Sequence, residues 1–380
     1  MKSLSILEII SSRRWIGEAA HVFNLSSRLI QRGHKVFLIT RRGWELSKKA
    51  DEAGLPNIPL NMNGHFNIRD NFEDISRLVA IFRNQKIDIV HSHRGHDHWL
   101  AALALSISRK KIPLMRTRHV NVAVKNHIFN KWLYNYKTDK IICVANHIRD
   151  NLISNNRFNE KKLEVIYTGA DTGLFDYRLS GEKIRREFRI SESSPVIGVV
   201  GRITPIKGHR FVLNAVPAIK KEFPDAKFIF AGDFRDRNFL THLQSIIEKL
   251  GIKESIIFTG FRDDIPEIVA SFDVAVISSK GSEGSSRACY EFMAMKKPII
   301  ATKVGIIPEI IEDGITGMLI SEMDSEAMAV AIIRTLKDRD GAKKLGEAAC
   351  NSLMKKFNFN VWVEKNERLF FEVVSSNEKK

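Results

Sequence analysis

Two acidic side chains and a run of small residues stand together where a strand is expected to lead into a helix. The segment Ser278–Ala294 follows an apolar run and contains Glu283 and Glu291, eight positions apart. With Glu291 two turns into the helix, the two carboxylates are roughly 12 Å apart, too far for the carboxylate pair of a glycosidase. They could instead accept hydrogen bonds from hydroxyls at opposite ends of an elongated ligand. A helix start binds phosphate readily, and this one follows Gly284, Ser285 and Ser286.

The alternative for these acids is structural. Glu283 would then stabilise the helix dipole from the first turn. Glu291 would be an exposed acid in the middle of the helix.

Two basic side chains lie in a second loop that follows a strand. The segment Gly201–Gly208 is bounded by glycines and carries Arg202 and Lys207. A guanidinium and an ammonium at the carboxyl end of a strand could neutralise a diphosphate. The spacing is not that of a Walker loop. For each side chain alone, a solvated loop cation is an equal explanation.

The first half of the chain offers a glycine and a histidine at strand ends. Gly17 lies in Ser11–Glu18, where it could let a backbone approach a bound group or simply ease a turn. This segment lacks the GxGxxG dinucleotide pattern. His119 is preceded by Arg116 and Arg118, and it could donate a hydrogen bond to a sugar hydroxyl or a phosphate. A structural role is the alternative for both residues.

A histidine-rich run, His91–His98, invites a metal interpretation because it contains paired HxH spacings. No further well-spaced acidic or histidine partner stands out in the sequence. We therefore predict no metal site and expect these residues to be polar loop residues beside a cleft.

Strands and helices that could position these loops alternate in two sets. Apolar, β-branched runs of strand length are separated by amphipathic stretches, as in parallel sheets covered on both faces. The expected strands are Leu4–Ile10, Val36–Thr40, Ile87–His91, Pro113–Arg116, Lys140–Val144 and Glu164–Tyr167, then Val196–Val200, Lys227–Phe230, Ser255–Phe258, Asp273–Ile277, Pro298–Ala301 and Gly317–Ile320.

This alternation predicts an α/β protein with two doubly wound, Rossmann-like domains whose strand ends face a central cleft. A polar, turn-rich stretch near residues 172–194 places the join between them. We predict domains at 1–178 and 179–358. An aromatic, amphipathic helix in 359–380 should pack back on the first domain.

Composition excludes several classes of protein. A hydrophobic content of 44% with 27% charged residues is globular, and three cysteines without a CxxC pair indicate a reducing compartment rather than a disulfide framework. No run approaches the roughly 20 uncharged residues of a membrane span. The N-terminus lacks the apolar run of a signal peptide.

The formal charge of +16 is unevenly distributed. Residues 1–180 carry 29 Lys and Arg against 16 Asp and Glu, and residues 181–380 carry 31 against 28. This asymmetry suggests that the first half meets something anionic, such as nucleic acid, an acidic membrane or a phosphorylated substrate, and the alternative is a basic surface without a partner. Its basic stretch contains Arg109, Lys110, Lys111, Arg116, Arg118, Lys125, Lys131 and Lys137, with Ile128, Phe129, Trp132, Leu133, Tyr134 and Tyr136 at helical spacing. That apolar stripe either packs into the core or faces an anionic membrane.

Taken together, the loops resemble the retaining glycosyltransferases of family 4, which have the GT-B fold. The resemblance covers nearly the whole chain and is strongest over Val196–Ile320, including Phe230-Ala-Gly-Asp233 and Pro308-Glu-Ile-Ile311. In the first half, Asp88–His93 and Val165–Asp171 are similar to the same family. Two departures stand out: Ile16 and Ile306 occupy positions where the family usually has glycine.

The resemblance implies roles for the loop residues. Arg202 and Lys207 would contact the diphosphate of a nucleotide-sugar donor, beside Gly201. Glu283 would bind the donor sugar, next to Gly284, Ser285 and Ser286, and Glu291 would bind the ribose. His119 would approach the donor sugar and phosphate, and Gly17 would lie under the diphosphate. Such enzymes use no catalytic metal and no other cofactor.

The resemblance therefore implies a metal-independent hexosyltransferase, with the donor on the second domain and the acceptor on the basic first domain. The Glu-Gly-Ser-Ser-Arg form of the acidic motif is similar to enzymes of bacterial lipopolysaccharide core or cell-surface polysaccharide synthesis. We expect an anionic, lipid-linked glycan acceptor, no nucleic acid, and a cytoplasmic protein in peripheral contact with the inner face of the cell membrane. The alternatives are a nucleotide-sugar epimerase of the same fold and a basic nucleic-acid-binding protein.

Overall fold

The computed structural model of the 380-residue chain describes residues 3–64, 68–156, 158–234, 236–281 and 283–379. It divides into two compact units. The first unit comprises Met1–Thr168 and Asn360–Lys380, and the second comprises Gly169–Phe359. The join expected at 178/179 falls within the second unit.

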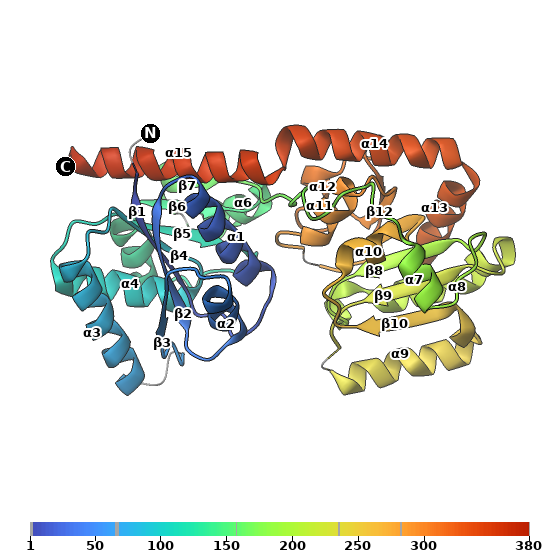
Figure 1. The fold of residues 1–380 in the computed structure, drawn as a ribbon, viewed down its shortest axis with the longest axis horizontal. Helices are drawn as coiled ribbons and strands as arrows, with labels where there is room; N and C mark the ends of the chain where they lie inside the picture. Colours follow the sequence, from blue (N-terminus) through green and yellow to red (C-terminus); the bar gives the residue numbers. More distant parts are fainter. Residues whose placement is uncertain (1–2, 65–67, 157, 235, 282, 380) are drawn as a thin grey trace. The chain divides into compact units, whose positions relative to one another are not determined.

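The first unit is built on a parallel sheet of strands in the order β3-β2-β1-β4-β5-β6-β7 (Figure 1). Most of its strands are buried on both faces, as expected for a sheet with a helix between successive strands. They are β1 (Ser5–Ile10), β2 (Lys35–Arg41), β3 (Asn57–Leu60), β4 (Ile89–Ser92), β5 (Leu114–Arg118), β6 (Lys140–Cys143) and β7 (Leu163–Val165). The helices are α1 (Gly17–Gln31), α2 (Glu45–Glu52), α3 (Ile68–Asn84), α4 (Gly95–Ser108), α5 (Ile128–Trp132) and α6 (Asn146–Asn156).

The sequence analysis missed β3. This strand has only four residues and contains Pro59, which cannot donate a backbone hydrogen bond. It lies at the edge of the sheet and pairs only with β2 among the described strands, which is where proline is tolerated.

The last helix, α15 (Phe359–Glu378), belongs to the first unit from Asn360 onward, as predicted. Its Glu367 accepts hydrogen bonds from Arg32 Nε at 2.9 Å and from His34 Nε2 at 2.7 Å. The rings of Trp362 and Phe370 contact those of His21 and His91 at centroid distances of 4.6 and 5.3 Å. The helix thus covers polar side chains near the middle of the first sheet.

The second unit contains a parallel sheet in the order β10-β9-β8-β11-β12-β13. The strands are β8 (Val196–Val200), β9 (Lys227–Ala231), β10 (Ile256–Gly260), β11 (Val274–Ile277), β12 (Ile299–Thr302) and β13 (Met318–Ile320). The helices are α7 (Glu182–Glu187), α8 (His209–Glu222), α9 (Arg237–Leu250), α10 (Ile265–Ala270), α11 (Arg287–Ala294), α12 (Ile307–Ile310), α13 (Ser325–Lys337) and α14 (Arg339–Lys356). The sheet and its helices match the expected doubly wound pattern.

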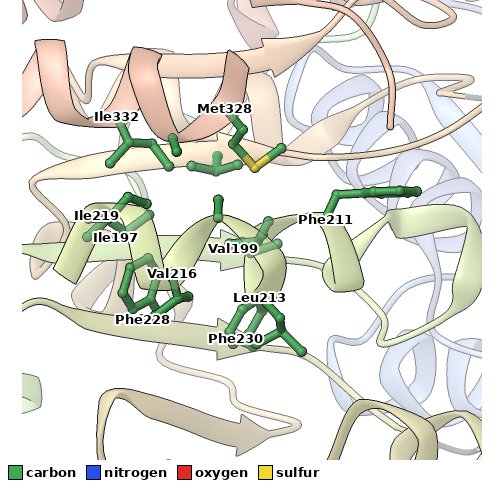
Figure 2. Packing of buried hydrophobic residues seen from close by; sticks show 14 of the residues in the cluster. Ile197, Val199, Phe211, Leu213, Val216, Ile219, Phe228, Phe230, Met328 and Ile332 are labelled. Atoms are coloured by element: carbon green, nitrogen blue, oxygen red, sulfur yellow. The ribbon is translucent and has the colours of Figure 1, made fainter. Parts of the chain in front are cut away.

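The core of the second unit lies where α8 and α13 meet the sheet (Figure 2). Figure 2 shows Met328 and Ile332 of α13 gathered with Val216 and Ile219 of α8 near Val199 of β8. All five side chains are buried, and each contributes about 1.5–3 kcal/mol to stability by leaving water. This packing holds rigid the strands whose carboxyl ends carry the predicted site.

Candidate active site

The predicted residues of the second unit follow two neighbouring strands at the point where the sheet order reverses. β8 lies between β9 and β11, so the connections from β8 and β11 run to opposite sides of the sheet. Ligands of open α/β sheets bind at such a point, outside the carboxyl ends of the strands. The 201–208 loop follows β8, and the 278–286 segment follows β11.

A buried carboxylate joins these two loops. Glu283 is only 4% exposed, and its Oε1 accepts hydrogen bonds from Lys207 Nζ and Ser279 Oγ. A second bond runs from Ser278 Oγ to the carbonyl of Lys207 at 2.8 Å. The cation from one loop and the acid from the other are therefore held together. Glu283 precedes α11 and is not a first-turn acid, contrary to the structural alternative.

Two glycines permit these close approaches. Gly208 has φ +68°, and a Cβ there would lie 1.8 Å from the carbonyl oxygen of Ser278. Gly305 has φ +56°, and its Cβ would lie 2.1 Å from the carbonyl oxygen of Glu283. The next residue, Ile306, donates its N–H to that oxygen at 2.9 Å. The backbone of Glu283 is thus fixed by a segment in which Gly305 is required, whereas Ile306 contributes through its backbone.

The other acid lies inside α11. Glu291 is 8% exposed, and its Oε1 accepts a hydrogen bond from Arg287 at 3.0 Å. It is therefore not the exposed surface acid of the structural alternative. Ser286, immediately before the helix, has a left-handed backbone (φ 38°, ψ 55°), which costs a non-glycine residue about 1–2 kcal/mol. Backbone strain of this kind is concentrated at functional sites.

The remaining predicted residues of this unit lie in the same loops. Arg202 is exposed, and among the described residues none forms an ion pair with it. It follows Gly201, whose carbonyl oxygen lies 2.0 Å from where a Cβ of Gly232 would be. Gly284 and Ser285 are half-buried and lie between Glu283 and the start of α11. The 201–208 loop therefore carries an exposed guanidinium that forms no ion pair with the described residues, and an ammonium that is paired with a buried acid.

The first unit has its own reversal of strand order, between β1 and β4. Gly17 is the first residue of α1, which follows β1, and Ile16 caps that helix in an extended conformation. His119 directly follows β5, the neighbour of β4, and is buried. These two predicted residues thus follow strands at or beside the switch point of their own sheet.

His119 belongs to a hydrogen-bonded cluster that the sequence did not reveal. Its Nε2 lies 3.1 Å from Nδ1 of His93, and His93 Nε2 lies 2.7 Å from Oε2 of Glu8. The same carboxylate accepts from Nδ1 of His91 at 3.0 Å. The ring of His21 packs edge-on against that of His119 at 4.6 Å. Burial, followed by the charges of neighbouring histidines, holds the pKa of both His93 and His119 well below the usual value.

The cluster changes the metal argument. His21, His93 and His119 each offer a ring nitrogen within 4.8 Å of the others, and Glu8, His91 and His93 form a second such group. The sequence-based prediction of no metal site relied on the lack of further acidic or histidine partners for the histidine-rich run. The structure shows that such partners exist, so this premise is wrong. The acid and two of the imidazoles are, however, already hydrogen-bonded to one another, so the ring nitrogens of His91 and His93 have partners without an ion.

The basic segment of the first unit is split between core and surface. Arg116 and Arg118 lie on β5 and are buried, so they cannot belong to an exposed basic cluster as the sequence suggested. In α5, Ile128 and Phe129 are 75% and 66% exposed. Leu133 and Tyr134, in the π-helical turn that follows, are buried. The second part of the apolar stripe therefore packs into the core, and its first part is exposed to solvent.

Sequence reasoning missed three polar residues of these sites: Ser279, Glu8 and His21. Glu8 carried a signal, since a charged residue inside the buried strand Ser5–Ile10 needs partners. Ser279 and His21 carried none, because a serine after a strand and a histidine on a helix are both common. Among the described residues, no helix is long and apolar enough to cross a membrane.

Comparison with known proteins identifies the family. The model for glycosyl transferases group 1 matches residues 180–352, and that for glycosyltransferase family 4 matches residues 16–174. N-acetyl-alpha-D-glucosaminyl L-malate synthase of Bacillus anthracis is 25% identical over 92% of each chain. A glycosyltransferase from Rickettsia africae ESF-5 is 25% identical over 98% of this chain and 99% of that one, with a TM-score of 0.91.

WaaG, a glycosyltransferase involved in lipopolysaccharide biosynthesis, is 15% identical, with 97% and 99% of the two chains covered and a TM-score of 0.72. This last likeness concerns the fold. The two family models lie end to end over the two Rossmann-like units and include all the predicted site residues. The chain is a family 4 glycosyltransferase with the GT-B fold.

Proposed function

We propose that this glycosyltransferase moves a sugar from a nucleotide-diphosphate-sugar to an acceptor hydroxyl with retention of anomeric configuration and without a catalytic metal. The bond between the anomeric carbon and the diphosphate oxygen breaks, and a bond to the acceptor oxygen forms on the same face of the sugar. The acceptor proton leaves with the diphosphate. Negative charge therefore grows on the diphosphate in the transition state.

The observation that carries this proposal is the pairing of Lys207 with buried Glu283 at the switch point of the second sheet. Glu283 orients the ammonium without occupying all its protons, since an ammonium has three. Arg202, exposed in the same loop, supplies a second cation. Two cations in place before the reaction stabilise a leaving diphosphate without a metal ion. Glu283 keeps an oxygen for a sugar hydroxyl, and Glu291 is the acid for the ribose.

The test is Lys207→Met, with Lys221→Met as the matched control. Lys221 is an exposed lysine on α8 of the same unit, so the two variants lose the same charge. We expect kcat to fall about 10²–10³-fold in the first variant and to stay near wild type in the second. The donor is first found by thermal shift, because a ligand at 100 times its Kd stabilises by about 2.7 kcal/mol. Normal turnover by folded Lys207→Met would refute the assignment.

The rival functions give different products. An epimerase of the same fold would change or release the donor sugar without an acceptor, so NMR of an acceptor-free reaction separates it from a transferase. NMR of the glycoside product then gives the anomeric configuration. A nucleic-acid-binding protein would show duplex binding that weakens steeply with salt.

We propose an anionic, lipid-linked glycan as the acceptor, such as lipopolysaccharide core, reached by peripheral contact with an anionic membrane. The support is the exposed apolar pair Ile128 and Phe129 beside the exposed lysines Lys125 and Lys131. Each basic residue near an anionic surface contributes about 1 kcal/mol, so the contact should be sensitive to salt. A soluble anionic acceptor is the second candidate, because the Bacillus anthracis relative is named for a product that contains malate, an anion.

Vesicle sedimentation distinguishes the two acceptors. We expect binding to anionic vesicles, little binding to neutral ones, and release by salt. Lys125→Glu with Lys131→Glu should abolish it, whereas the same charge change at two exposed lysines of α14, Lys343→Glu with Lys344→Glu, should have less effect. A wild-type protein that ignores anionic vesicles at low salt would favour the soluble acceptor.

A further inference from the structure

The buried cluster around Glu8 forms a continuous chain of hydrogen bonds that ends at His119. In the register of the sheet, Glu8 of β1 lies opposite His91 of β4, and His93 follows two residues later. Oε2 of Glu8 lies 2.7 Å from His93 Nε2, and His93 Nδ1 lies 3.1 Å from His119 Nε2. All four side chains are buried, so bulk water does not replace these partners.

The direction of every bond in this chain can be assigned by counting protons. A carboxylate only accepts, so His91 donates to Glu8 through Nδ1–H and His93 donates through Nε2–H. A neutral imidazole carries a single N–H, which leaves Nδ1 of His93 as an acceptor. The bond between the two rings therefore uses the Nε2–H of His119. Desolvation, which lowers the pKa of His93 and of His119, keeps both rings neutral and agrees with this assignment.

His91 completes the count at the other side of Glu8. Its Nε2 lies 2.8 Å from Oγ1 of Thr117, and a hydroxyl can donate to it. His91 thus donates through Nδ1–H, whereas His93 and His119 donate through Nε2–H. One buried carboxylate sets all three tautomers.

The remaining nitrogen of His119, Nδ1, forms no hydrogen bond with the described residues and carries a lone pair. We propose that Glu8 and His93 are positioning residues that fix His119 as a hydrogen-bond acceptor, so that its Nδ1 accepts a hydrogen bond from a substrate hydroxyl and does not donate to a phosphate oxygen. This inference rests on the proposed function for the role of His119 in substrate binding. It replaces the sequence-based expectation of a donating His119, and it assigns Glu8 and His93 an effect on specificity.

The first test measures tautomers in the unmodified full-length protein. Long-range ¹H–¹⁵N correlation spectra of histidine-labelled protein distinguish a protonated ring nitrogen from one with a lone pair. We expect His93 and His119 as Nε2–H tautomers and His91 as the Nδ1–H tautomer, in spectra assigned by single substitutions. An Nδ1–H or a doubly protonated His119 would overturn the proposal. A divalent metal bound stoichiometrically to these nitrogens would overturn it too.

The second test separates positioning from packing with two matched variants. His93→Phe removes the acceptor that fixes His119, whereas His91→Phe makes the same change in a ring that also bonds Glu8 but does not contact His119. We expect His93→Phe to give mixed His119 tautomers and at least a tenfold lower kcat, with an unchanged Kd for free nucleoside diphosphate. His91→Phe should keep the His119 tautomer and the wild-type kcat. A merely structural role would lower the Tm of both variants and leave the tautomer unmoved.

The conservative variant His93→Asn completes the design, since its amide oxygen stands near the position of Nδ1 and can accept from His119. It should restore the Nε2–H tautomer of His119 and most of kcat. If His93→Phe does not fold, the wild-type tautomers decide alone. If His119→Ala retains full kcat, the proposed role of His119 in the reaction is wrong, while the tautomer spectra still test the hydrogen-bond chain.

Discussion

Adding one methyl group at Gly305 should lower the activity of the enzyme by displacing a different residue, Glu283. A Cβ at position 305 would lie 2.1 Å from the carbonyl oxygen and 2.6 Å from the nitrogen of Glu283. Real Cβ atoms essentially never show contacts below 3.0 Å, so the Glu283 backbone must be displaced relative to residue 305 by about 1 Å. The carboxylate that holds Lys207 moves with it. A misplacement of about 1 Å in a catalytic group lowers the rate roughly 10²-fold, which is the loss we expect in kcat.

The control for Gly305→Ala is Gly314→Ala in the same unit. Gly314 also has a left-handed backbone, with φ +76°, but nothing lies within 4 Å of its Cβ position. Both variants should lose about 1–2 kcal/mol of unfolding free energy from the left-handed conformation, measured by urea denaturation. Only Gly305→Ala should lose kcat as well. Equal activity of the two folded variants would refute the argument that Gly305 positions Glu283.

Three further predictions follow from the site and from a buried histidine. Arg202→Ala should leave the Tm unchanged and lower kcat about 10²–10³-fold, as expected for a lost charge-stabilising donor. Glu291→Gln should raise the Kd for free nucleoside diphosphate, measured by calorimetry. Glu283→Gln should lower kcat and leave that Kd nearly unchanged. Burial lowers the pKa of His209 to about 4 in the folded protein. Between about pH 6.5 and pH 4 the imidazole is therefore protonated in the unfolded protein and neutral in the folded protein. The unfolding free energy should therefore fall as the pH drops from 6.5 to 4, by roughly 3 kcal/mol, and His209→Leu should remove this part of the slope.

Each of these predictions has a distinct contrary result. Full turnover by Arg202→Ala would leave the exposed guanidinium as a solvated surface cation. Equal losses of nucleotide affinity in the two glutamate variants would mean that the sugar and ribose roles are wrong. An identical pH dependence in wild type and His209→Leu would show that the imidazole is protonated in the folded state.

The sequence was sufficient to predict the alternation of strands and helices because buried parallel strands are apolar on both faces. It was sufficient for the 201–208 and 278–286 loops too, since both follow unmistakable strands. The short strand Asn57–Leu60 was not predicted, because Pro59 interrupts the pattern of residues that is typical of a strand. The predicted join at 178/179 lies after the observed start of the second unit at Gly169, because the polar, turn-rich sequence continues beyond that residue.

The histidine cluster could not be predicted from spacing along the chain. Glu8, His91, His93 and His119 come from β1, β4 and the end of β5, which are adjacent in the sheet and far apart in sequence. Strand order brings them together, and spacing alone does not give strand order. The same holds for Gly305, whose importance lies in its contact with the backbone of Glu283, 22 residues earlier.

The division of the first unit into two stretches of chain has a consequence for synthesis on the ribosome. The 191 residues of the second unit, Gly169–Phe359, are made before α15, which completes the first unit. At a synthesis rate of roughly 5–20 residues per second, the first unit lacks its last helix for about 10–40 s after residue 168 has been added. During this time His91 lacks Phe370, and His34 lacks Glu367. The second unit can close its own core earlier, so the nascent chain should contain one folded unit before the first unit is complete.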